Sequence, residues 1–366
     1  MRIHMVGGFL GSGKTTAISQ AAKILVGRNK RVGIITNDQG KHLVDTAFYR
    51  AQDFPALEVT GGCFCCNFND LSEQIEKIAK EYNPDILFAE SVGSCADIVA
   101  TVVKPLQEIR NDLGEAASYS VFVDVRLLER FLEGSEMPFS EDVSYIFAKQ
   151  IEEASNLIIN KIDLMDKERV SKAAAMAGER YPRAVIVLQN SLDEKNVEAW
   201  LELIEGKALP TDLPSLEIDY DRYASGEQEM AWVDSHYAIE VEEDRGLKRL
   251  AGMVIEIVHR IDQIQHVKGH LKFQIEGNGR NAKVSVPTLH ESDDAFEKEV
   301  GLRISNLGKG KLQLWINALI VGNVERLQAT INEIMFAPSA DSTIKIEELE
   351  SFTRVPGYPK PTYRIN

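Results

Sequence analysis

The chain has 366 residues, of which 44% are hydrophobic and 27% are charged, and its formal net charge at pH 7 is −15. This length allows one large domain and a smaller one, and the acidic balance argues against a nucleic-acid or anionic-membrane partner. No apolar run is long enough to cross a bilayer, and the N-terminal MRIHMVGGFL is too short for a signal-peptide core.

Residues 1–205 alternate short apolar runs with amphipathic stretches, which predicts an α/β fold. Continuous β-rich runs are typical of strands buried on both faces of a mainly parallel sheet. Their alternation with helices implies right-handed crossovers and the open, doubly wound sheet of a P-loop NTPase. In one helical stretch Leu71 and Ile75 share an apolar stripe, and Asp70 and Glu73 have the spacing of a capping box. The predicted strands lie at residues 3–6, 32–36, 86–89, 121–123, 157–159 and 184–188.

The segment GFLGSGKT at residues 8–15 matches the pattern GxxxxGK[ST] and lies between a predicted strand and a predicted helix. Its glycines let backbone N–H groups turn inward around phosphates, beside the positive end of the helix. Lys14 is expected to reach the β- and γ-phosphates, and the Thr15 hydroxyl is expected to bind Mg²⁺. The predicted nucleotide-binding residues of this loop are Gly8, Gly11, Ser12, Gly13, Lys14, Thr15 and Thr16.

Two further segments follow predicted strands and have the features of nucleotide-sensing switches. Asn37-Asp38-Gln39-Gly40 follows the strand at 32–36 and is the candidate first switch, with Asp38 predicted to lie near the metal and the attacking water. Glu90 follows the strand at 86–89 and is predicted to hold a Mg²⁺-bound water, while the N–H of Gly93 meets the γ-phosphate. We assign catalytic roles to Lys14, Asp38 and Glu90; the alternative for either segment is an ordinary strand-end turn.

Three of the four cysteines fall within four residues, in the sequence GGCFCC at 61–66. Cys63 and Cys66 have the CxxC spacing that lets one turn present two thiolates to one ion, and Cys65 can supply a third. Sulfur ligands favour Zn²⁺ or Cu(I), with Co²⁺ and Ni²⁺ as further options. Buried or redox-active thiols without a metal are the alternative. Clustered thiols also indicate a reducing compartment, so we expect a cytoplasmic protein. Additional candidate ligands are Asp38, His42 and Cys95.

The tetrapeptide NKID at residues 160–163 follows the predicted strand at 157–159, at the edge where open α/β sheets bind ligands. Asp163 can accept two hydrogen bonds from guanine, from N1–H and the exocyclic amine, whereas adenine has an acceptor in place of the N1–H. Asn160 is expected to hold the loop and contact the base, and Lys161 is expected to pack over the ring. The sequence therefore predicts GTP and GDP as ligands.

The pattern changes after residue 205. Residues 206–234 are rich in Pro, Ser, Gly and acids, which predicts a linker. Period-two apolar patterns over 235–336 indicate a smaller α+β domain with a mainly antiparallel sheet. Residues 337–366 contain four prolines and no clear periodicity, so we expect an extended tail.

Taken in order, GGFLGSGKTT, GGCFCC, ESVG and NKID resemble the motifs of the CobW-like GTPases, relatives of the nickel-inserting GTPases for hydrogenase and urease. The resemblance covers residues 1–205, and His266-Val267-Lys268-Gly269 is similar to the family's C-terminal module. It implies Mg²⁺-dependent GTP hydrolysis, transition-metal binding at Cys63, Cys65 and Cys66, and a metallochaperone role with a possible nucleotide-dependent homodimer. Where the family commonly reads NEFGE, this chain has Asn37-Asp38-Gln39-Gly40-Lys41.

The leading hypothesis is slow GTP hydrolysis coupled to delivery of a transition metal, zinc first, to a client metalloprotein. The second is a GTP-regulated docking module for a metalloenzyme or corrinoid enzyme, with a structural metal at the cysteines. The third is a cysteine redox sensor fused to a GTPase. Loss of metal on GTP hydrolysis separates the first hypothesis from the second.

Overall fold

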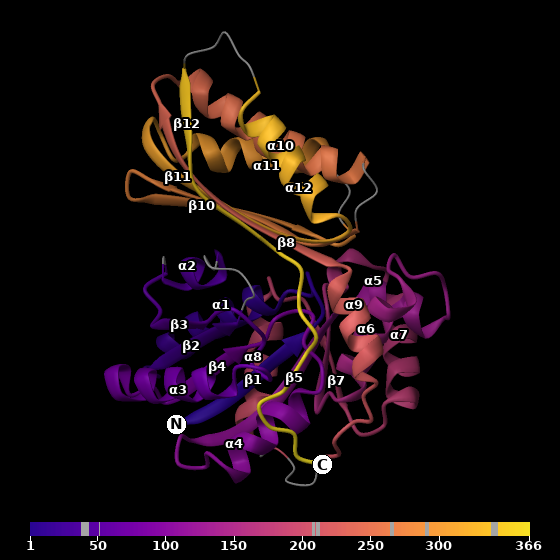
Figure 1. The fold of residues 1–366 in the computed structure, drawn as a ribbon. Coiled ribbons are helices and arrows are strands. Elements are labelled where there is room, and N and C mark those ends of the chain that lie inside the picture. Colours follow the sequence, from indigo (N-terminus) through magenta and orange to yellow (C-terminus); the bar gives the residue numbers. More distant parts are fainter. Residues whose placement is uncertain are drawn as a thin grey trace. The chain divides into compact units, whose positions relative to one another are not determined.

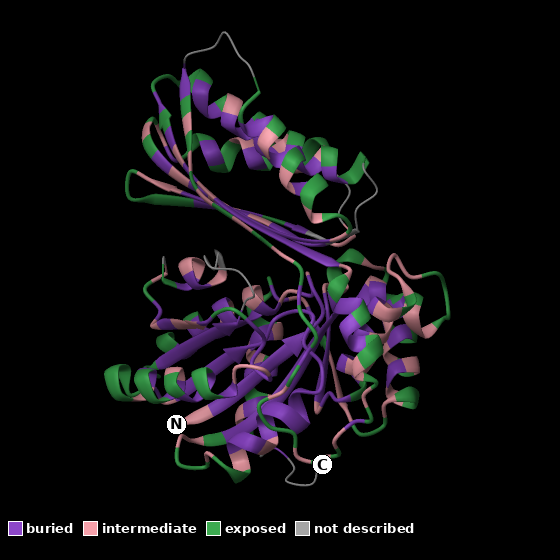
Figure 2. Cartoon of the chain, viewed as in Figure 1, coloured by how far each residue is buried: buried purple, intermediate pink, exposed green. Residues whose placement is uncertain are grey.

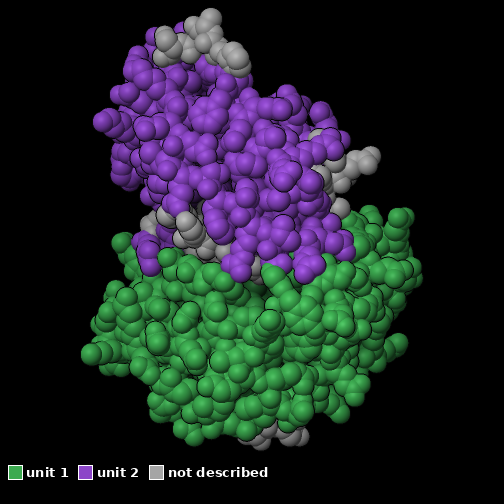
Figure 3. Space-filling model, viewed as in Figure 1, with its two compact units in different colours: residues 1–39, 52–227, 357–366 green, residues 40–51, 228–356 purple. Residues whose placement is uncertain are grey.

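The structure is a computed structural model and describes residues 1–37, 44–50, 52–206, 209, 213–263, 267–289, 293–337 and 343–366. The chain divides into two compact units, which Figure 3 colours separately. The predicted site residues Asp38 and His42, and His266 of the C-terminal pattern, lie outside the described residues. The first unit contains Met1–Gln39, Gln52–Glu227 and Gly357–Asn366, and the second contains Gly40–Ala51 and Gln228–Pro356.

The first unit is built on a seven-stranded sheet in the order β3-β2-β4-β1-β5-β6-β7 (Figure 1). Every neighbouring pair of strands is parallel, and helices connect strands along the chain. The central strands are buried almost throughout (Figure 2), as the continuous apolar runs require. The predicted doubly wound P-loop fold is confirmed. The strands are β1 Arg2–Gly8, β2 Val32–Asn37, β3 Ala56–Val59, β4 Ile86–Glu90, β5 Glu115–Asp124, β6 Asn156–Asn160 and β7 Val185–Gln189.

Eight helices and two short turns of this unit are described. The predicted helix around Leu71 is present, but its predicted capping box is wrong: Asn67 is the N-cap residue, and its side chain makes no capping hydrogen bond. Asp70 instead lies in the first turn, where its charge favours the helix dipole. The helices are α1 Lys14–Gly27, α3 Phe68–Tyr82, α4 Lys104–Glu108, α5 Val125–Leu132, α6 Glu141–Glu152, α7 Lys167–Arg180, α8 Glu194–Gly206 and α9 Tyr220–Gln228, with a π-helical turn Val99–Val103 and a 3-10 turn Ile162–Leu164.

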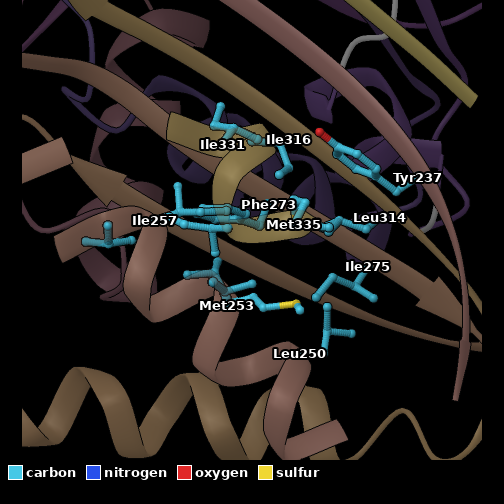
Figure 4. Close-up of a cluster of buried hydrophobic side chains, with 14 of the residues drawn as sticks. Tyr237, Leu250, Met253, Ile257, Phe273, Ile275, Leu314, Ile316, Ile331 and Met335 are labelled. Carbon is cyan, nitrogen blue, oxygen red and sulfur yellow. The ribbon is translucent and has the colours of Figure 1, made fainter. Parts of the chain in front are cut away.

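The second unit contains a five-stranded antiparallel sheet in the order β10-β9-β11-β8-β12, with three long helices. Alternate residues of the strands, such as Phe273 and Leu314, pack with Leu250 and Ile331 of the helices in a single apolar core (Figure 4). The predicted antiparallel α+β domain is therefore confirmed. Its elements are α2 Val44–Arg50, β8 Met230–Val241, α10 Asp244–Gln263, β9 Val267–Gly277, β10 Arg280–Pro287, α11 Asp294–Ser305, β11 Gly310–Val321, α12 Val324–Met335 and β12 Ile344–Arg354.

The boundaries differ from the predicted ones in three places. The expected linker at 206–234 holds helix α9 and the start of β8. Most of the expected tail at 337–366 is ordered: β12 pairs with β8, and residues 357–366 join the first unit. Helix α2 belongs to the second unit because the Asp45 carboxylate pairs with the ammonium groups of Lys272 at 2.5 Å and Lys283 at 3.3 Å. Among the described residues, every helix is too short or too polar to cross a membrane.

Candidate nucleotide and metal site

The phosphate loop joins β1 to α1 and follows a backbone course that only its glycines adopt readily. Gly8, Gly11 and Gly13 have φ angles of 122°, 69° and 96°. A Cβ at Gly8 would collide with the backbone of Phe122, and one at Gly13 would collide with the Asn160 side chain. The glycine spacing of the motif is therefore required by the loop and by its neighbours on β5 and β6.

Lys14 and Thr15, at the start of α1, place a cation and a hydroxyl beside this loop. The Lys14 ammonium is buried and donates to the carbonyl oxygens of Gly8 at 2.6 Å and Phe9 at 3.2 Å. Thr15 Oγ1 donates to Glu90 Oε1 at 2.7 Å, and Glu90, the last residue of β4, is 4% exposed. A hydroxyl in contact with a buried carboxylate beside a phosphate loop is an oxygen donor set that fits Mg²⁺.

Asn160 connects the phosphate loop to the loop that follows β7. Its Nδ2 donates to the Ser12 carbonyl at 2.7 Å. Its Oδ1 accepts hydrogen bonds from the N–H of Ser191 at 3.1 Å and from the Ser191 hydroxyl at 2.9 Å. The side chain thus holds two loops at the carboxyl edge of the sheet, and the predicted contact between Asn160 and a base stays a prediction.

Lys161 and Asp163 lie directly after Asn160 at the same edge. Lys161 has a φ angle of 61°, and its Nζ lies 3.1 Å from Asp124 Oδ2 at the end of β5. Asp163 lies in the 3-10 turn and is exposed. The carboxylate of Asp163 is exposed and the lysine stem is anchored, and the contacts of both residues with guanine stay a prediction.

Four sulfur atoms gather in the same unit. Cys63, Cys65 and Cys66, between β3 and α3, have sulfurs within 4.8 Å of one another. Cys65 Sγ lies 2.7 Å from Cys63 Sγ, 3.8 Å from Cys66 Sγ and 3.8 Å from Cys95 Sγ, and all four thiols are free. A tetrahedral zinc ion with Zn–S distances of about 2.3 Å separates its sulfurs by about 3.8 Å. Cys95, one of the additional candidate ligands, contacts Cys65 but is not among the three cysteines whose sulfurs all lie within 4.8 Å of one another.

The crowding of these thiols sets their ionisation. Contact with Cys63 and burial raise the pKa of Cys66 to about 11. Contacts with Cys63, Cys66 and Cys95, together with burial, raise the pKa of Cys65. Hydrogen bonds from Cys63 and Cys65 lower the pKa of Cys95 to about 6. Raised pKa values favour the protonated thiols of Cys65 and Cys66, so a cation that bound them would have to displace protons.

Asn37, the last residue of β2, makes three hydrogen bonds to the cysteine loop and to the end of β3. Its buried Nδ2 donates to the carbonyl oxygens of Val59 at 3.1 Å and Gly62 at 2.7 Å. Its Oδ1 accepts a hydrogen bond from the N–H of Phe64 at 2.8 Å. One side chain therefore determines the backbone positions on both sides of Cys63.

The segment after β4 connects the phosphate loop to the cysteines. A Cβ at Gly93 would collide with Leu10 of the phosphate loop, so these two backbones lie in close contact. Gln150 Nε2, on α6, donates to the carbonyl oxygens of Gly93 and Cys95, both at 2.9 Å. Gly93 and Cys95 are only two residues apart, so the predicted γ-phosphate contact and the fourth sulfur share one short segment.

A family comparison agrees with this arrangement. The model of the CobW/HypB/UreG nucleotide-binding domain matches residues 2–188, which is more than half of the 366 residues. The chain belongs to the CobW/HypB/UreG family of GTPases. The matched range contains the phosphate loop, the cysteine loop, the segment after β4 and the NKID sequence, and the resemblance expected from these motifs is confirmed.

The individual relatives share less than a third of their aligned residues with the chain. The chain is 29% identical over 222 residues to the zinc chaperone YeiR of Escherichia coli, which covers 58% of each chain. It is 24% identical over 211 residues to the zinc-regulated GTPase metalloprotein activator 1 of Dictyostelium discoideum, covering 50% of this chain and 44% of that protein. The chain thus spans about half the length of these relatives. A solved structure of HypB from Helicobacter pylori in complex with nickel is 20% identical, with a TM-score of 0.41, and covers 57% of this chain and 89% of HypB.

No sequence motif predicts several contacts of the residues near Cys95. Tyr223 on α9 accepts from the N–H of Ala96 at 3.1 Å, and the Ser94 hydroxyl donates to Glu227 on α9 at 2.7 Å. The sequence predicts a linker where α9 lies. The buried contact of Glu227 with Ser94 depends on tertiary structure, and helical periodicity does not reveal it. The sequence predicts Asn37 as the start of the first switch but not its hydrogen bonds to the cysteine loop, and it does not predict the contacts of residues 357–366 with that loop.

Proposed function

We propose that this chain hydrolyses GTP and couples its nucleotide state to the binding and delivery of a transition metal, zinc first, to a client metalloprotein. The observation that carries the proposal is the position of Cys95. Its sulfur lies 3.8 Å from Cys65, and it follows the phosphate-loop contact at Gly93 by two residues. A γ-phosphate that repositions this segment would move one of four sulfurs.

The nucleotide roles follow from the contacts at the sheet edge. Lys14 is positioned to move from loop carbonyls to phosphate oxygens, and Asp163 to accept hydrogen bonds from guanine. Thr15 and Glu90 would hold Mg²⁺, directly and through water, in place of their present hydrogen bond. When bound, Mg²⁺ neutralises charge that develops between the β- and γ-phosphates.

The metal roles follow from the sulfur cluster. Cys63, Cys65 and Cys66 supply three thiolates, and Cys95 can complete a tetrahedron or withdraw from it. Zinc is the first choice because four sulfurs suit it and because relatives of the chain carry the name zinc chaperone. Co²⁺ and Ni²⁺ remain acceptable to the same ligands.

The alternative function is GTP-regulated docking to a metalloenzyme or corrinoid enzyme, with a metal held permanently at the cysteines. The deep burial of Cys63 and Cys65 favours this alternative, because a metal bound to buried sulfurs is less accessible to a client protein. The two functions differ in one measurable property, since only delivery requires the metal affinity to change with the nucleotide.

The test is an anaerobic titration with Co²⁺, followed by thiolate-to-cobalt absorption, in GDP and then in a non-hydrolysable GTP analogue. We expect at least about a tenfold difference in affinity, which corresponds to about 1.4 kcal/mol of coupling. Cys63→Ser should remove the absorption band. Lys14→Ala is the matched control, because it should remove the nucleotide effect and leave the band. Equal affinity in both nucleotides would exclude delivery and leave the docking function; absence of a band would exclude both.

A further inference from the structure

Residues 357–366 return to the first unit after the chain has formed the whole second unit. They run along the cysteine loop and make three hydrogen bonds to it. The N–H of Lys360 donates to Cys66 Sγ at 3.3 Å. The N–H of Thr362 donates to the Cys65 carbonyl at 2.9 Å, and the Thr362 hydroxyl donates to the Cys66 carbonyl at 2.8 Å. Residues near the C-terminus therefore contact both the buried Cys65 and the partly exposed Cys66.

The same segment is anchored by the three residues that follow these bonds. Arg364 Nε lies 2.8 Å from Asp97 Oδ2, and the Asp97 side chain is only 2% exposed. The Tyr363 ring meets the ring of buried Phe68 edge to face, with centroids 5.4 Å apart. The N–H of Ile365 donates to the Ala100 carbonyl at 2.9 Å. These contacts join the segment both to α3, which follows the cysteine loop, and to the residues that follow Cys95.

The local sequence prepares one donor for this position. Lys360 lies between Pro359 and Pro361, and a proline has no N–H. Proline at 361 also restricts Lys360 to an extended conformation, so little conformational freedom is lost on binding. Among residues 359–361 the Lys360 amide is thus the single backbone N–H, and it points at the sulfur of Cys66.

Cys66 is the sulfur for which such a donor matters most. It is partly exposed, whereas Cys63, Cys65 and Cys95 are buried. A hydrogen bond to a charged acceptor is stronger than a neutral one and fixes the direction of the acceptor's remaining lone pairs. Groups that orient metal ligands in this way commonly change metal affinity by 10–100-fold.

We propose that Gly357–Asn366 is a component of the metal site, in which the Lys360 N–H orients the Cys66 thiolate and Thr362 fixes the backbone that carries Cys65 and Cys66. This proposal rests on metal binding by the cysteines, which is part of the proposed function. It adds that the affinity of the cluster, and the ease with which Cys66 leaves the ion, depend on residues far from the cysteine motif.

Lys360→Pro tests the proposal in the full-length chain, because it removes the N–H and keeps the extended conformation. Lys360→Ala is the matched control, since it removes the exposed side chain and keeps the N–H. In Co²⁺ titrations we expect about tenfold weaker binding for Lys360→Pro and a change below about twofold for Lys360→Ala. Equal affinity of the proline variant and the unmodified chain would overturn the proposal.

A second variant and a second readout protect the test against misfolding and against failure of the proposed function. Thr362→Val removes only the hydroxyl donor to the Cys66 carbonyl, and circular dichroism checks the fold of each variant. In metal-free protein, the reaction rate of Cys66 with a thiol reagent should fall in Lys360→Pro, because the lost N–H no longer stabilises the reactive thiolate, and stay unchanged in Lys360→Ala. Thr362→Val keeps the Lys360 N–H, so it should weaken cobalt binding less than Lys360→Pro. If the unmodified chain binds no cobalt, the proposed function fails, and only the thiol reaction rates test whether the segment orients Cys66. Equal rates in Lys360→Pro and the unmodified chain would then overturn the inference about Cys66 as well.

Discussion

The phosphate loop and the cysteine loop lie in the same unit but are stabilised in different ways. The phosphate loop takes its conformation mainly from its own eight residues, with glycines at positive φ and a lysine that donates to loop carbonyls, although Asn160 also holds the Ser12 carbonyl. The cysteine loop depends on partners elsewhere in the chain, with Asn37 bound to the Gly62 carbonyl and Lys360 bound to the Cys66 sulfur. The first loop can therefore be recognised, and altered, locally. The second can be altered by substitutions hundreds of residues from its cysteines.

The largest expected effect comes from the locally determined loop. Lys14→Ala removes the cation that is placed to reach the phosphates, so GTP affinity and turnover should fall by about 100-fold or more. Fluorescent-nucleotide binding and phosphate release measure the two quantities. Cobalt affinity in the absence of nucleotide should not change. A comparable loss of cobalt binding would show that the two loops are not stabilised independently.

The pH dependence of metal binding examines the cysteine loop as a whole. The raised pKa values of Cys65 and Cys66, the latter about 11, mean that metal binding releases protons near neutral pH. Metal affinity should therefore rise with pH, by at least about tenfold per pH unit between pH 6 and 8, because each displaced proton contributes one factor of ten. Calorimetry in buffers of different ionisation enthalpy counts the protons. Affinity that is constant with pH would mean that the thiols are already ionised.

Asn37→Ala tests the support that Asn37 gives to the cysteine loop. The three lost hydrogen bonds should lower cobalt affinity by about tenfold, while the affinity for GDP changes little. Asn67→Ala is the matched control, because Asn67 Nδ2 donates to the Thr60 carbonyl of the same loop from its exposed side, at 3.2 Å. Equal losses in both variants would assign the effect to general loosening rather than to Asn37.

The smallest expected effect concerns stability alone. Glu153, the residue directly after α6, accepts hydrogen bonds from the N–H of Val99 and the hydroxyl of Tyr119. Burial raises the pKa of Glu153 from 4.5 to about 8. A raised carboxyl pKa gives stability that is complete below pH 4.5 and is lost as the pH rises through 8. Glu153→Gln should therefore match the unmodified chain at pH 4 and exceed it at pH 6 by about 2 kcal/mol, because pH 6 lies about 1.5 units above the unfolded pKa of 4.5. Thermal unfolding at the two pH values checks this; a difference that is the same at both would contradict it.

The predictability of the molecule follows the same division. The sequence predicts the buried parallel strands, the phosphate loop and the NKID segment, because each is a run of neighbouring residues with one physical requirement. The strand β3 was missed because it has four residues and includes Glu58. Helix α9 and strand β12 were missed because their partners, such as Ser94 for Glu227 and β8 for β12, lie far away in sequence. The tertiary role of Asn37 was missed for the same reason: one amide carries no periodicity.

The contact between Lys360 and Cys66 joins residues 294 positions apart, and this separation has a consequence for biosynthesis. A ribosome releases the cysteine loop long before it makes the proline-flanked donor that orients Cys66. During that interval the nascent polypeptide presents its thiols without the covering segment, and any early metal uptake would use a looser ligand set. Maturation of the site therefore ends only when the second unit has been translated and the chain has crossed back to the first.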